Sequence, residues 1–89
     1  MDLLILGLLI QNGAEMYGLQ LVSESEGKVR RGTVYVTLGR MEEKGFVESR
    51  LEAVTNRPGL PRRLYRASAL GARVHSSLRL AARRFAEQA

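Results

Sequence analysis

The apolar positions along the chain predict a series of short helices. Residues 3–10 are nearly all apolar, and they favour a buried helix because leucine is common there and β-branched residues are few. The turn dipeptide Asn12-Gly13 ends this segment. A second helix is expected from residue 15 to residue 25, with Gly27 as its stop signal.

The third predicted helix covers residues 33–44. Val34, Leu38 and Met41 are spaced at i, i+4 and i+7, so they form one buried stripe. Gly45 lies just past the end, where a left-handed residue commonly closes a helix. The opposite face is expected to carry Thr33, Val36, Thr37, Arg40 and Lys44.

The pattern then changes from a helical period to a period of two. Residues 46–53 alternate in a way typical of a strand, and residues 62–67 read as a second strand. Residues 54–61 between them contain asparagine, glycine and both prolines of the chain, which indicates a loop. The two strands therefore predict an antiparallel hairpin that packs on the helices.

A long last helix is predicted at residues 69–87, with Ser68 as its N-cap. Its apolar residues recur at spacings of three and four, and we expect them to form a dimer interface: Leu70, Val74, Leu78, Ala81 and Phe85. The predicted fold is mainly α with a small β-hairpin, a winged helix-turn-helix over residues 1–67 followed by a C-terminal dimerisation helix at 68–89.

Composition narrows the class of protein. A chain of 89 residues fits one domain with a modest core, and a homodimer would bury more apolar surface. The chain has no cysteine, so disulfides and thiolate metal sites are excluded and a cytoplasmic location is expected. The N-terminal apolar run is too short to span a bilayer, so no membrane partner is expected. The net charge of +5 favours a polyanionic partner.

The positions of the basic residues point to double-stranded DNA. A recognition helix places its N-terminal residues in the major groove, and a basic wing can follow the phosphate backbone. For the third helix and its approach, the candidate DNA-binding residues are Lys28, Arg30, Arg31, Thr33, Tyr35, Val36, Thr37 and Arg40. For the wing, the candidates are Arg57, Arg62 and Arg63.

An enzyme is not indicated. His75 is the one histidine of the chain, and it lies in the predicted last helix with no acid positioned beside it. The sequence has no zinc ligand set, no phosphate-binding loop and no dinucleotide glycine fingerprint, so no metal and no cofactor is predicted.

Four segments resemble the PadR-like winged-helix transcriptional regulators. They are ILGLL at residues 5–9, MYGLQLV at 16–22, GTVY through MEEKGFVESR at 32–50, and PRRLYR at 61–66 followed by Ser68 and Gly71. The third segment is the strongest match, and together the four cover nearly the whole chain in the family's order. The chain differs from the family at Val36, where proline usually follows the tyrosine.

The resemblance implies repression of transcription through a palindromic operator. It also implies dimerisation through the C-terminal helix and, in many members, a small hydrophobic or phenolic effector. Two other functions stay open, because a fold does not determine a function: a winged-helix adaptor that binds a protein partner, and a ligand sensor without DNA binding.

Overall fold

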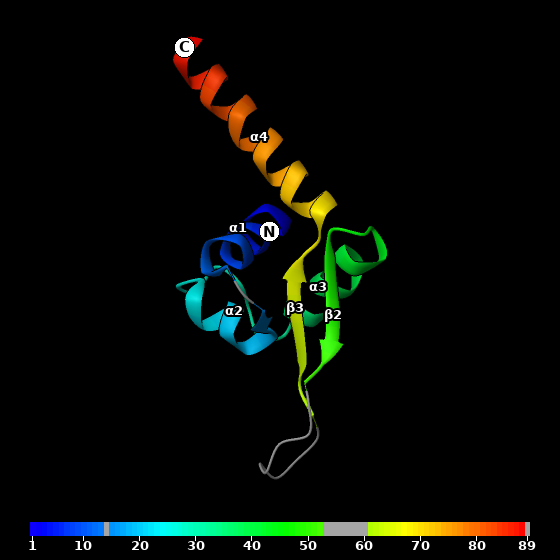
Figure 1. The fold of residues 1–89 in the computed structure, drawn as a ribbon. Helices are drawn as coiled ribbons and strands as arrows, with labels where there is room; N and C mark the ends of the chain where they lie inside the picture. Colours follow the sequence, from blue (N-terminus) through cyan, green and yellow to red (C-terminus); the bar gives the residue numbers. More distant parts are fainter. Residues whose placement is uncertain (14, 53–60, 89) are drawn as a thin grey trace.

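The computed structural model describes residues 1–13, 15–52 and 61–88. In chain order its elements are α1 (Asp2–Asn12), β1 (Met16–Tyr17), α2 (Gly18–Glu24), α3 (Val34–Glu43), β2 (Val47–Leu51), β3 (Arg63–Ala67) and α4 (Ala69–Gln88). The first three helices gather around the sheet, and α4 projects from the end of the domain opposite the end where β2 finishes and β3 begins (Figure 1). The predicted fold class is confirmed.

Local signals end the helices where expected. Gly13 adopts a left-handed conformation with φ of 63° after α1, and Gly45 does so with φ of 82° after α3. After α3, the Phe46 amide donates to the Met41 carbonyl at 2.9 Å, and the Gly45 amide donates to Glu42 at 3.0 Å. This pair of bonds is a Schellman motif, which satisfies carbonyls that a helix end leaves free.

The sheet has three strands, although the sequence predicts only two. Its order is β1-β3-β2 and both pairings are antiparallel, with Met16 opposite Tyr65 on one side and Ser49 opposite Tyr65 on the other. The expectation that a helix begins at residue 15 is therefore wrong. The chain is extended at Met16–Tyr17, and α2 begins only at Gly18, after the Tyr17 amide donates to Gln20 Oε1 at 2.7 Å.

The core lies between the first three helices and the inner face of the sheet. The predicted stripe of Val34, Leu38 and Met41 is fully buried, which confirms the phase of α3. The other buried apolar side chains come from every element before α4: Ile5, Leu6, Leu9, Met16, Leu21, Val29, Val47 and Tyr65. Because α4 contributes no large side chain to this core, most of its apolar surface remains uncovered.

The N-terminus of α4 is fastened to the turn that ends α3. The Ser68 hydroxyl donates to the Gly45 carbonyl and accepts the Gly71 amide at 3.0 Å, so Ser68 is the N-cap, as predicted. The Ser68 amide donates to the Phe46 carbonyl at 3.0 Å. No helix in the described part of the chain is long and apolar enough to cross a membrane.

Candidate nucleic-acid interface

The exposed face of α3 carries most of the predicted contact residues. Val36 is 67% exposed and Tyr35 49%, and Thr33 and Arg40 are also exposed. Thr33 is the N-cap, so this face begins at the helix end whose free amides and dipole favour an anion. The arrangement suits contact with a phosphate at the N-terminus and with base edges along the first two turns.

Thr37 is a correction to this set. Its side chain is only 4% exposed, and its hydroxyl lies 3.6 Å from the Met1 sulfur. The helix phase explains the burial, because residue 37 lies three positions after Val34 and four before Met41, within the buried arc. The expectation that Thr37 faces a ligand is therefore wrong.

The turn between α2 and α3 presents three cations. Val29 is buried, and its amide donates to the Ser25 hydroxyl at 2.9 Å, which anchors the turn. Lys28, Arg30 and Arg31 around this anchor are exposed. Within the described residues, no carboxylate pairs with these three side chains or with Arg40. Their charge is therefore available to a polyanion.

Tyr35 packs on one side and is open on the other. A Cβ atom placed on Gly18 would lie 2.6 Å from Tyr35 Cε1, so the ring lies directly against the first residue of α2. This contact fixes how closely the two helices of the helix-turn-helix approach. The predicted contact residue is thus partly a packing residue, with the rest of its ring exposed.

The hairpin of β2 and β3 forms the wing, and hydrogen bonds on one face of the sheet connect it to α3. Arg63 Nη1 donates to the Ser49 hydroxyl at 3.1 Å, and that hydroxyl donates to Glu42 Oε2 of α3 at 2.5 Å. Leu51 lies opposite Arg63 in the register and is 56% exposed. The predicted residue Arg63 is therefore exposed and held on the same side of the molecule as α3.

Arg62 points to the other face of the sheet. Its guanidinium lies 4.0 Å from the centre of the Tyr17 ring, and its Nε atom is 3.8 Å from Glu52 Oε1. Tyr17 in turn donates to Glu52 Oε2 at 2.5 Å. Neither Tyr17 nor Glu52 was identified from the sequence, because their partners lie far along the chain. Arg57, the third predicted wing residue, lies outside the described residues.

On the face of the sheet that carries Arg62, here called the outer face, Arg50 and Arg66 are each paired with a carboxylate. Arg50 makes two hydrogen bonds of 2.7 Å to Glu15, and Arg66 Nη2 lies 2.8 Å from Glu48 Oε2. The hydrogen bonds and charge of Arg50 hold the pKa of the Glu15 carboxyl below its ordinary value of 4.5. Within the described residues, the cations without a carboxylate partner therefore lie beside α3 and along α4 rather than on this face.

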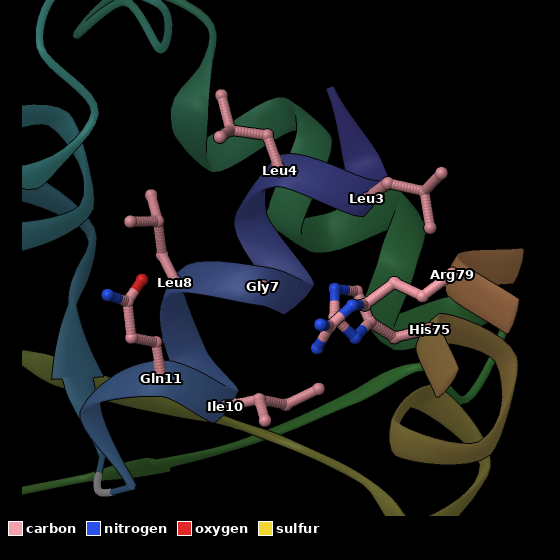
Figure 2. A pocket seen from close by; sticks show the side chains of 8 residues that line it. All are labelled: Leu3, Leu4, Gly7, Leu8, Ile10, Gln11, His75 and Arg79. Carbon is pink, nitrogen blue, oxygen red and sulfur yellow. The ribbon is translucent and has the colours of Figure 1, made fainter. Parts of the chain in front are cut away.

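A second candidate site lies between α1 and α4. An open groove of about 550 Å³ is lined by Leu3, Leu4, Gly7, Leu8, Ile10 and Gln11 from α1 and by His75 and Arg79 from α4. Figure 2 shows His75 and Arg79 beside Gly7, with Leu3 and Ile10 on the same side of α1 and Leu8 and Gln11 pointing away from them. Gly7 makes this approach possible, since a Cβ there would lie 3.2 Å from His75 Nε2. The predicted dimer stripe runs beside the groove, with Leu70 40%, Leu78 47% and Phe85 78% exposed. Ala81 is also exposed and Val74 is half-buried.

Comparison with known proteins gives a consistent result. The family model described as the transcriptional regulator PadR-like family matches residues 5–77. No curated protein sequence matches the chain.

Solved structures share the fold at low identity. A PadR family transcription regulator from Clostridium difficile R20291 has a TM-score of 0.80 at 22% identity, over 97% of this chain and 90% of its own. A PadR-like transcription factor from Bacteroides fragilis has a TM-score of 0.81 at 21% identity, over 98% and 84%. Bacillus subtilis PadR, solved in complex with operator DNA, has a TM-score of 0.74 at 19% identity, over 86% of this chain and 45% of its own.

Proposed function

Because the chain belongs to the PadR-like family of transcriptional regulators, we propose that it binds duplex DNA sequence-specifically as a homodimer and represses transcription from a palindromic operator. The observation that carries this proposal is the set of cations around the exposed face of α3 that have no carboxylate partner among the described residues. The operator complex of Bacillus subtilis PadR, which shares the fold, supports it.

The proposed contacts follow from the positions of the side chains. Arg30, Arg31 and the N-terminus of α3 bind phosphates, and Arg40 lies far enough along the helix to reach a base edge or a phosphate. Phosphate contacts supply most of the affinity, and base contacts supply the specificity. Lys28 and Thr33 add phosphate contacts at the same end.

On the wing, we assign the phosphate contact to Arg63. It is exposed and lies on the face of the sheet that is tied to α3 through Ser49. Arg62 faces Tyr17 and Glu52 instead, so moving it to a phosphate would break a cation–π contact and an ion pair. Its proposed role is to hold the base of the wing in place.

We propose that the chain divides into a DNA-binding domain at 1–67 and a C-terminal dimerisation segment at 68–89, and that the dimer forms through α4 of that segment. This helix has 20 residues, and large apolar side chains remain exposed along it, including Leu78 and Phe85. An uncovered apolar stripe of this kind is costly in water. A second copy would cover it, and a two-fold axis would place two α3 helices in successive major grooves, about 34 Å apart.

An effector has a candidate place in the same region. The groove in Figure 2 is mainly apolar, and Arg79 and His75 at its edge can donate hydrogen bonds to a phenolate or carboxylate oxygen. A small hydrophobic or phenolic molecule bound there would lie at the proposed dimer interface. It would change the relative placement of the two DNA-binding domains.

The test is binding to random-sequence duplex at two salt concentrations. Wild-type protein should lose affinity steeply as salt rises, and the Arg30→Ala/Arg31→Ala variant should reduce the slope of log affinity against log salt by about 1.8. Arg83→Ala/Arg84→Ala removes the same charge from the far end of α4 and should leave the slope unchanged. If the wild-type protein shows no salt-dependent binding, the proposal fails and the adaptor alternative becomes the better one.

A further inference from the structure

Val36 and Gly39 lie on the solvent-facing side of α3, where Val36 is exposed and Gly39 is half-buried. They are one turn apart on the side opposite the buried stripe of Val34, Leu38 and Met41. A Cβ atom placed on Gly39 would have no neighbour within 4 Å, and the Val36 side chain is 67% exposed. The middle of the candidate interface is therefore a bare backbone segment beside a small apolar side chain.

The fold does not account for either residue. Glycine and the β-branched valine are both weaker helix formers than alanine. Neither gains from packing here, because Val36 is exposed and a Cβ on Gly39 would have no neighbour within 4 Å. Gly39 also has an ordinary helical backbone, because it is not among the positive-φ residues of the chain. Val36 and Gly39 together form one ridge along α3. The presence of both residues on this ridge therefore indicates a contact outside the monomer.

The surrounding charge and the chemistry of the pair identify that contact. The unpaired cations Arg30, Arg31 and Arg40 surround the ridge and complement a polyanion. Val36 can make no hydrogen bond, and the apolar group that B-DNA presents in the major groove is the C5-methyl of thymine. A missing Cβ at Gly39 allows a base edge to approach the helix backbone closely.

We propose that Val36 and Gly39 form a seat for a thymine methyl group, so that each α3 selects a T·A pair at one position of each operator half-site. This specificity rests on the proposed DNA-binding function. It adds a preference for one base pair that comes from shape and apolar contact, whereas the arginines supply electrostatic attraction to the DNA.

The test uses the duplex that the wild-type protein recovers from a random pool. Each dT of a half-site is replaced in turn by dU, which removes only the methyl group. A replacement in one half-site should weaken binding about fourfold, the effect of one buried methyl group, and the same replacement in both half-sites should weaken it about 16-fold. In Val36→Ala, the same replacement should have no effect, because the contact is already lost. If the wild-type protein binds with a steep salt slope but no dU replacement weakens it, the thymine seat is overturned and the DNA-binding proposal stands.

Gly39→Ala supplies a second and independent readout. It should raise the melting temperature, because alanine favours the helix, and lower the affinity for the recovered duplex about tenfold, because its methyl group occupies the space meant for the base. Ser23→Ala makes a similar change at an exposed position of α2 and should stabilise the protein without changing the affinity. Unchanged affinity in Gly39→Ala would overturn the close approach at this residue, and an absence of binding by the wild-type protein would overturn the proposed function itself.

Discussion

Gly71 of α4 lies directly against the backbone carbonyl of Phe46. A Cβ atom on Gly71 would come within 2.0 Å of that oxygen, and the Ser68 amide donates a hydrogen bond to it at 3.0 Å. Phe46 belongs to the turn that closes α3. The proposed dimer helix therefore starts on the end of the proposed recognition helix, and a rotation of α4 in the dimer would be passed to α3 through these backbone contacts.

Replacing Gly71 should damage the fold. In Gly71→Ala the methyl group meets a hydrogen-bonded backbone carbonyl, so either the first turn of α4 or the end of α3 must move. We expect the free energy of unfolding to fall by about 2–3 kcal/mol and the melting temperature by about 10–20 °C. Gly32→Ala is the control, because nothing lies within 4 Å of a Cβ there. Equal melting temperatures for the two variants would contradict this contact.

The contact between Gly18 and Tyr35 should appear as an energetic coupling. Gly18→Ala should cost about 1–2 kcal/mol of unfolding free energy, because the new methyl group overlaps the Tyr35 ring. In a Tyr35→Ala background the ring is gone, and the same change should cost much less, since alanine is then accommodated in α2. Urea denaturation of the four proteins in this cycle measures the coupling. Additive effects would mean that the ring moves aside at no cost.

Local rules predicted much of the fold. The ends of α1 and α3 are set by glycines in left-handed turns, and the phase of α3 follows from three apolar residues on one side. Thr37 was misplaced because a hydroxyl suggests solvent, whereas the phase of the helix places it beside Val34 and Met41. In α3, the position of residue 37 around the helix axis determines its burial, and the polarity of its hydroxyl does not.

Interactions between distant segments were not predictable. Strand β1 has only two residues, too few to show a period, and its partner Tyr65 lies nearly fifty residues away. The same distance hides the role of Arg62, whose charge looks free in the sequence until Tyr17 and Glu52 are placed beside it. The site was therefore predicted as a set of cations, and the structure shows which of the described ones have a carboxylate partner and which do not.

The Glu15–Arg50 pair should make stability depend on acid pH. Its hydrogen bonds lower the folded-state pKa of Glu15 below 4.5, so the unfolded chain takes up the proton first as the pH falls. The contribution is complete above pH 4.5 and is lost as the pH falls through the lower folded-state value. In Arg50→Gln the pKa of Glu15, followed by NMR of its carboxyl, should rise towards 4.5. The unfolding free energy of the variant should also fall less steeply below pH 4.5 than that of the wild type. An unchanged Glu15 pKa would show that the pair does not form in solution.

The proposed dimer predicts opposite outcomes for two similar leucines of α4. Leu78 belongs to the predicted stripe and is 47% exposed, whereas Leu80 is 49% exposed and lies two residues on, about 200° around the helix. Leu78→Glu should place two carboxylates in the apolar interface and convert the dimer to monomer, as measured by analytical ultracentrifugation, because buried charges without partners are strongly unfavourable. The monomer should also bind the duplex recovered by the wild type with a shallower salt slope, since one α3 contacts fewer phosphates. Leu80→Glu makes the same chemical change off the stripe and should remain a dimer. If both variants remain dimeric, the interface lies elsewhere on the molecule, whereas dissociation of both would show that the partner covers a wider face of α4 than the stripe.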